Sequence, residues 1–223
     1  MEYRVDHIPR NTPHNRRPGH PMTATTITIH NTGNPSSSAR NERVWLTNPD
    51  NTRVASFHIV VDEREAIECL PINENAWHSG DGSGLASGNR TSIGIEICES
   101  GDYAKTLKNA AKLVARMLKD RGWGVNKLRR HYDWSEKICP RLMYDGGKWT
   151  GWTSFKNMVS AELAAAEEEV KLKMLKADAE KVIDVLQEAW RLDIRNADGN
   201  PLDRNEIHRL ANEVRKAAGL PLE

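Results

Sequence analysis

The segment SIGIEIC, residues 92–98, alternates apolar side chains with others, as a half-buried β-strand does. Isoleucines at positions 93, 95 and 97 share one face of this expected strand, and Gly94, Glu96 and Cys98 share the other. A carboxylate on an otherwise apolar strand is costly to bury unless it has a partner or a task. Glu96 is therefore a candidate catalytic residue.

Further elements follow outward from this strand. The sequence TTITIH, residues 25–30, predicts a second strand that ends with His30 on its polar face. Residues 56–61 and 66–70 predict a hairpin, and residues 39–46 predict a short helix. Residues 103–121 predict a helix, because their apolar residues recur every three or four positions and Gly122 follows them.

The composition changes after Trp152. Residues 160–181 are rich in Ala, Glu, Lys and Leu and predict a helix, and a second helix is expected after Asp203. The segment Asp198–Pro201 between them predicts a turn. We therefore place one domain at residues 1–159 and an all-helical C-terminal appendage at 160–223. The appendage could form a bundle, dock on the first domain or dimerise. A DNA-binding helix-turn-helix is disfavoured because the turn is too long.

Composition excludes several classes of protein. The chain has 223 residues, with 32 basic and 31 acidic side chains, which gives a net charge of +1. This balance argues against general binding to nucleic acids or anionic membranes. The chain has no apolar run near the ~20 residues that a membrane span needs. Three cysteines do not make a disulfide framework. The first 22 residues lack the apolar region of a signal peptide, so we expect synthesis in the cytoplasm without one and, for an external substrate, another export route.

The most chemically informative segment is RHYDWSEKICP, residues 130–140. His131 and Cys139 stand eight residues apart, and imidazole and thiolate are both good zinc ligands. His30, at its strand end, is the candidate third ligand. Three protein ligands leave the fourth position open for water, which is the catalytic arrangement. Glu96 would then act as general base, and Lys137 would stabilise a developing oxyanion.

Three motifs in order resemble one family: IHNTG at His30, SIGIEI at Glu96, and HYDWSxKxCP from His131 to Pro140. They resemble the type-2 N-acetylmuramoyl-L-alanine amidases, which share a fold with the peptidoglycan recognition proteins, and look closest to phage and prophage endolysins of Gram-positive hosts. The resemblance implies an α/β fold with a central mixed β-sheet flanked by helices. It also implies cleavage of the amide between the lactyl group of N-acetylmuramic acid and L-Ala. By motif, it assigns Zn²⁺ to His30, His131 and Cys139, and catalysis to Glu96 and Lys137.

Substrate contacts are expected from the loop that precedes the Glu96 strand. Trp77 and His78 lie in the glycine-rich segment 75–84, where Trp77 could stack on a sugar or peptide face, and Arg90 lies just ahead of the strand. The alternative is that Trp77 and His78 simply cover the core. Some relatives carry a catalytic-site Tyr where this chain has Phe57, which would leave more of the acid–base chemistry to Glu96.

Two other functions compete with the lysin interpretation. One is a cytosolic amidase that recycles muropeptides. The other is a non-catalytic peptidoglycan-binding module, which the presence of Cys139 disfavours because binding-only members of the family lack this ligand. A lysin would reach the wall by a holin-type route, and by analogy with phage lysins the region 160–223 could bind the cell wall. The sequence predicts peptidoglycan as the partner, without nucleic acid or membrane insertion, and leaves the oligomeric state open.

Overall fold

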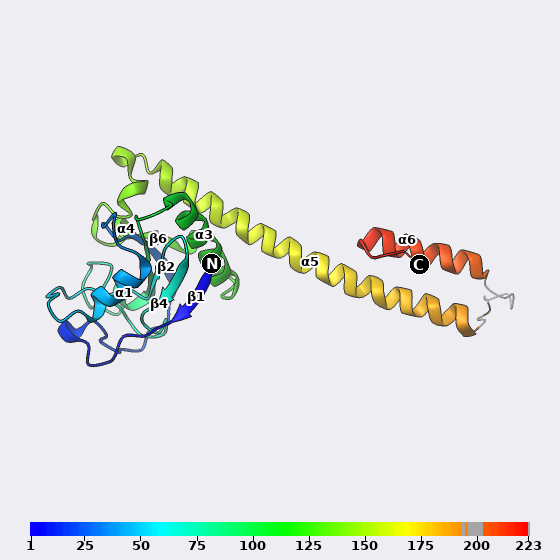
Figure 1. Ribbon diagram of the computed structural model, residues 1–223, viewed down its shortest axis with the longest axis horizontal. Coiled ribbons are helices and arrows are strands. Elements are labelled where there is room, and N and C mark those ends of the chain that lie inside the picture. Colours follow the sequence, from blue (N-terminus) through cyan, green and yellow to red (C-terminus); the bar gives the residue numbers. More distant parts are fainter. Residues whose placement is uncertain (193–194, 196–202, 223) are drawn as a thin grey trace. The chain divides into compact units, whose positions relative to one another are not determined.

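The computed structural model describes residues 1–192, 195 and 203–222 (Figure 1). The chain divides into two compact units, Met1–Leu163 and Ala164–Glu223. The first unit holds the β-sheet and its helices. The second holds the greater part of one long helix and the last helix of the chain.

A six-stranded sheet forms the centre of the first unit, in the order β1-β4-β3-β5-β2-β6. The strand bounds are β1 Glu2–Val5, β2 Thr26–Asn31, β3 Ile59–Val61, β4 Glu65–Glu68, β5 Ser92–Ile97 and β6 Leu128–Arg130. Strands β3 and β4 pair antiparallel, and the other neighbours pair parallel. The predicted mixed sheet is thus confirmed.

Helices cover both faces of this sheet. Their bounds are α1 Ala39–Thr47, α2 Gly88–Thr91, α3 Tyr103–Lys119, α4 Tyr132–Ser135, α5 Thr150–Leu192 and α6 Arg204–Ala218. The isoleucines of β2 and β5 pack in one cluster with α3 and with the start of α5, including Trp152 and Phe155. Ala39 and Leu46 of α1 pack in a second cluster with Cys98. The polar side chains of β2 and β5 therefore lie on the face opposite α3.

Some expected elements differ in the structure. The sequence pattern predicted no strand in the first 22 residues, but Glu2–Val5 forms β1 and pairs with β4. Leu128–Arg130 forms β6, which the sequence pattern did not predict. The predicted hairpin is present. Its first strand, β3, begins three residues later than expected, and its second strand, β4, begins one residue earlier and ends two residues earlier. Strands of three or four residues are too short to show a recognisable alternation.

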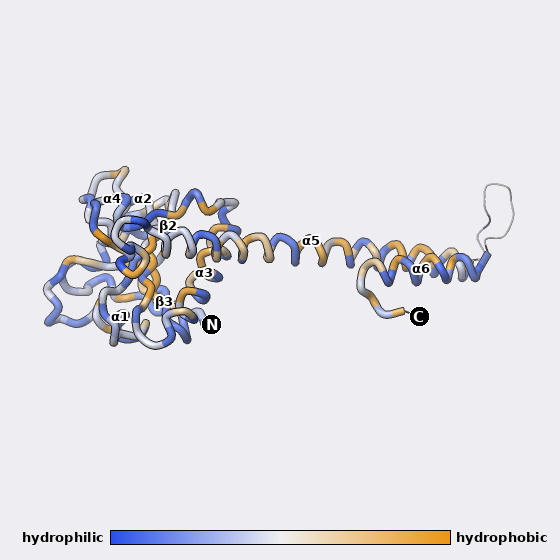
Figure 2. Tube along the Cα trace, turned by 90° about the horizontal axis from the view of Figure 1, so that it is seen from above, coloured by the Kyte–Doolittle hydropathy of each residue, from blue (hydrophilic) through white to orange (hydrophobic). Residues whose placement is uncertain are grey.

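The second unit is helical, as expected. Helix α5 begins at Thr150, ahead of the predicted start, and the proposed boundary at 159/160 falls inside it. Helix α6 begins after Asp203, whose side chain accepts a hydrogen bond from the Asn205 amide, and ends at Gly219 with φ 64°. The predicted turn at 198–201 lies outside the described residues. Figure 2 shows hydrophobic and hydrophilic residues interspersed along α5 and α6. Within the described residues, no helix is long and apolar enough to cross a bilayer.

Candidate metal centre

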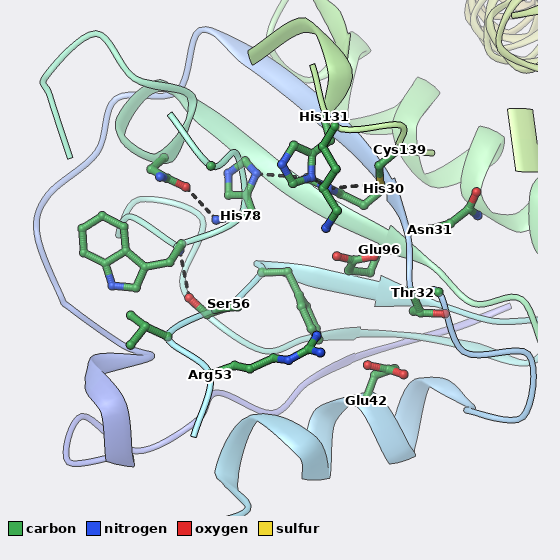
Figure 3. Close-up of a pocket in the computed structure, with 18 of the residues that line it drawn as sticks. His30, Asn31, Thr32, Glu42, Arg53, Ser56, His78, Glu96, His131 and Cys139 are labelled. Carbon is green, nitrogen blue, oxygen red and sulfur yellow. Dashed lines mark hydrogen bonds between the residues drawn. The ribbon is translucent and has the colours of Figure 1, made fainter. Parts of the chain in front are cut away.

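Three side chains from distant parts of the chain meet at the carboxyl ends of the central strands (Figure 3). His30 lies near the end of β2, and His131 directly follows β6, which pairs with β2. Cys139 is reached by the loop after α4. The Nδ1 atom of His30 lies 3.0 Å from Nδ1 of His131 and 3.7 Å from Sγ of Cys139. All three side chains are buried.

These separations can be compared with those of a zinc site. A tetrahedral zinc ion with bonds of about 2.0–2.1 Å to nitrogen and about 2.3 Å to sulfur holds two nitrogen ligands about 3.3 Å apart, and nitrogen and sulfur about 3.6 Å apart. The observed 3.0 and 3.7 Å lie close to these edges. Two imidazoles and one thiolate are also a donor set that zinc accepts. The residues present therefore fit a zinc ion with one coordination position left open.

Glu96 stands beside His30. The two residues are register partners on the parallel strands β2 and β5, so their side chains share one face of the sheet. The Oε2 atom of Glu96 is buried and has no hydrogen-bond partner among the described residues. Burial raises the pKa of Glu96 to about 8, and the negative charge of Glu42 adds to this effect. A buried oxygen without a partner is costly, so this atom is well placed to bind a group such as a reacting water.

Burial in the pocket sets the protonation states of the three candidate metal ligands. Burial lowers the pKa of His30 well below its ordinary value and that of His131 to about 4, with the charge of Lys137 contributing to both. Both imidazoles are therefore neutral near pH 7, as metal ligation requires. Burial raises the pKa of the Cys139 thiol to about 12 in the metal-free protein. Binding of a metal would release its proton, because a coordinating thiol is deprotonated outright.

A pocket of about 940 Å³ opens above these residues. His30, Glu96, His131, Lys137 and Cys139 all line it. Its other walls come from the start of the segment after β2, from α1, from the segment before β3 and from the loop before α2; these walls include Thr32, Asn34, Glu42, Trp45, Arg53, Phe57 and Trp77. The pocket is large enough for a sizeable organic ligand beside a metal and a water.

Comparison with known proteins identifies the family. Residues 20–142, more than half of the chain, match the family model described as N-acetylmuramoyl-L-alanine amidase. The chain belongs to this amidase family. It is 45% identical to the N-acetylmuramoyl-L-alanine amidase CwlA of Bacillus subtilis (strain 168). The alignment covers 147 residues, which are 64% of this chain and 52% of CwlA. Identity to XlyB of the same organism is 47% over 132 residues, 57% of this chain and 40% of the relative. The chain thus spans about half the length of the curated relatives it matches.

Solved structures of amidase-family proteins confirm the predicted fold. The catalytic domain of XlyA aligns with a TM-score of 0.63 and 41% identity, covering 71% of this chain and 99% of that domain. PlyL aligns with a TM-score of 0.61 and 35% identity, covering 72% of this chain and 98% of PlyL. The predicted resemblance to endolysins is also confirmed, since a Bacillus subtilis endolysin aligns with a TM-score of 0.63 and 40% identity, covering 71% of this chain and 99% of that one.

The amidase fold places the three predicted substrate-binding residues differently from one another. Trp77 is half-buried, lines the pocket and donates its indole N–H to the Asn15 carbonyl. Arg90 lies on α2, outside the pocket lining. His78 is 7% exposed, and its ring contacts His30. The substrate role stays a prediction for all three, and the contact with His30 points to a different role for His78.

The sequence pattern did not single out Arg16, which holds part of the pocket wall in place. The Arg16 side chain is fully buried and donates hydrogen bonds to four backbone carbonyls, those of Leu46, Asn48, Asn51 and Arg53. Its guanidinium also lies over the Trp45 ring, 5.9 Å from the centroid. Arg16 thus ties the loop after α1 to the pocket wall. Its hydrogen-bond acceptors are backbone carbonyls, so no side-chain motif could have indicated this role.

Proposed function

We propose that this chain is a zinc-dependent N-acetylmuramoyl-L-alanine amidase that hydrolyses the lactyl–L-Ala amide of peptidoglycan, as a phage or prophage endolysin. The observation that carries the proposal is the convergence of His30, His131 and Cys139 next to the buried, unpartnered carboxylate oxygen of Glu96. The names of the relatives CwlA and XlyB support the reaction.

Zinc would be held by Nδ1 of His30, Nδ1 of His131 and Sγ of Cys139, and when bound it supplies a Lewis acid and lowers the pKa of a water to about 7. Glu96 accepts the proton of the attacking water through its free Oε2 atom. The carboxyl of Glu96 then returns this proton to the L-Ala nitrogen as the C–N bond breaks. The products are a lactyl carboxylate on the sugar and a free amino group on the stem peptide.

Lys137 and Trp77 have supporting roles in this proposal. Lys137 is exposed at the pocket, where its ammonium group stabilises the negative charge that develops on the scissile carbonyl oxygen. Trp77, which also lines the pocket, offers an aromatic face to the substrate. We assign catalysis to residues 1–159, and cell-wall binding or oligomerisation to the helical region 160–223. Action at the wall after a holin-type release belongs to the same proposal.

The test combines product and metal analysis on one sample. Purified cell wall digested with the protein should release peptides with new L-Ala amino termini, identified by mass spectrometry, while metal analysis gives close to one zinc per chain. Parallel digestion of soluble anhydro-muropeptides separates a lysin from a recycling amidase, because a recycling enzyme would favour the soluble fragments. Cleavage of glycan or of peptide cross-links, or zinc-loaded protein without any turnover, would overturn the proposal.

A further inference from the structure

Behind His30, away from the other two ligands, lies the buried imidazole of His78 (Figure 3). Its Nδ1 atom is 3.1 Å from Nε2 of His30, and its Nε2 atom is 3.0 Å from the carbonyl oxygen of Ser92. The backbone N–H of His78 donates to Oδ1 of Asn89 at 2.6 Å. His78 therefore connects a backbone carbonyl of β5 to a candidate metal ligand on β2.

The direction of these hydrogen bonds follows from the chemistry of the groups. A carbonyl oxygen can only accept, so Nε2 of His78 must carry the proton and donate it to Ser92. A neutral imidazole has one N–H, and the contact with the Ser92 carbonyl places it on Nε2, so the Nδ1 atom of His78 has only a lone pair. The contact at 3.1 Å then requires His30 to donate from Nε2. His30 is thereby left with a lone pair on Nδ1, the atom that faces His131 and Cys139.

We propose that His78 is a positioning residue that fixes the tautomer and ring orientation of His30 for metal binding, through the carbonyl of Ser92. The inference deepens the proposed function and rests on it for the identity of the metal. Outer partners of this kind orient metal-bound histidines, and their loss typically weakens metal binding by about 10–100-fold.

The sheet is built to receive this ring. A Cβ added to Gly94 of β5 would come within 2.7 Å of Cγ of His78, so the ring packs directly on the glycine backbone. Asn89 holds the chain at this point by accepting hydrogen bonds from the backbone N–H groups of both His78 and Ser79. The loop is therefore anchored on either side of the imidazole, which restricts the ring to one position.

The second imidazole ligand has a comparable arrangement without an intermediate side chain. His131 has a hydrogen bond with the backbone of Ser79, and its Nε2 atom lies on the side of Gly80. Nδ1 of His131 is thus also left to face the metal position. A carbonyl fixes each imidazole ligand, directly for His131 and through His78 for His30.

The experiment uses the full chain and three variants. His78→Asn keeps an acceptor near the position of Nδ1, whereas His78→Leu removes it. The matched control is Thr28→Val, which removes two hydrogen bonds on the same face, one shared with Ser92 Oγ and one donated by the Trp134 indole, and leaves the hydrogen-bonding atoms around His78 in place. Zinc affinity is measured by competition with a chromophoric chelator. Ring ¹⁵N shifts of His30 in chelator-stripped protein report its tautomer by NMR.

We expect His78→Leu to weaken zinc binding about 10–100-fold, and His78→Asn and Thr28→Val to stay within a few-fold of the unchanged chain. In stripped, unsubstituted protein, His30 should carry its proton on Nε2. An unchanged zinc affinity in His78→Leu, or an Nδ1 proton on His30, would overturn the inference. If His78→Leu does not fold, the tautomer of His30 in the unsubstituted protein still tests the inference. Neither zinc affinity nor the His30 tautomer depends on turnover. A protein without turnover would therefore contradict the proposed reaction but not this inference.

Discussion

Replacement of Glu96 by Gln separates catalysis from stability. The substitution keeps the shape of the side chain and removes both the proton acceptor and the charge. Loss of general-base help typically lowers the rate by about 10²–10⁴-fold, which corresponds to about 3–5 kcal/mol in the barrier. Zinc content should not change, because the three ligand atoms meet without Glu96.

Whereas turnover should fall, the stability of the metal-free protein should rise in Glu96→Gln. Burial raises the pKa of Glu96 from 4.5 to about 8, so the folded state holds this proton more tightly than the unfolded state does. Stability is therefore lost as pH rises from 4.5 towards 8, and below 4.5 the effect is absent. At pH 7 the linkage limit is about 3.4 kcal/mol, from 1.36 kcal/mol per pKa unit. Since Glu96 keeps some contact with the open pocket, we expect Glu96→Gln to stabilise the stripped protein by about 1–3 kcal/mol at pH 7.

Urea unfolding of chelator-stripped protein at pH 4.5 and 7 measures this difference, with turnover on cell wall measured on the zinc-loaded form. Glu167→Gln, an exposed carboxylate on α5, is the matched control and should change neither quantity. Wild-type turnover in Glu96→Gln, or equal stability of the two proteins at pH 7, would refute the reasoning. Loss of zinc from the variant would make Glu96 a ligand instead of a base.

Three further predictions concern the metal, the pocket wall and pH. Cys139→Ser should lose turnover and most of its zinc affinity. Chelation should lower the melting temperature of the unchanged chain, since a ligand at 100 times its Kd contributes about 2.7 kcal/mol to the stability of the folded state. A metal-free protein that melts at the same temperature as the zinc-loaded protein would contradict this. Arg16→Met leaves four carbonyls without their donor, so we expect about 3 kcal/mol or more of destabilisation in urea and a larger change in KM than in kcat; an unchanged KM would show that the loop does not shape the pocket. The Arg17 hydrogen bond lowers the pKa of Glu74, so this pair stabilises the fold above pH 4.5 and is lost as pH falls further; Glu74→Gln should flatten the acid limb of a stability–pH curve, and an unaltered limb would argue against it.

The sequence could predict the strands that carry the site because their side chains alternate over enough residues. Six-residue strands such as β2 and β5 show which face is apolar, and this already places His30 and Glu96 on polar faces. Periodicity does not show that these two residues are direct neighbours, because the register between strands far apart in the chain is set by packing against α3. The three-residue strand β6 was missed for lack of a pattern, although it is the element that brings His131 beside β2.

The roles of His78 and Arg16 could not be predicted for a different reason. Arg16 bonds to four backbone carbonyls and His78 is held by one, and because any residue type can supply a carbonyl, these partners leave no trace in the sequence. His78 stands next to Trp77 in a glycine-rich loop, which makes the pair look like two substrate contacts. The two neighbours have different surroundings. Asn89 accepts a hydrogen bond from the His78 backbone, and the buried His78 ring lies against β5, whereas Trp77 is half-exposed at the pocket. Candidate metal ligands can therefore be proposed from their chemistry, but candidates for the residues that orient them emerge only when the backbone around them is known.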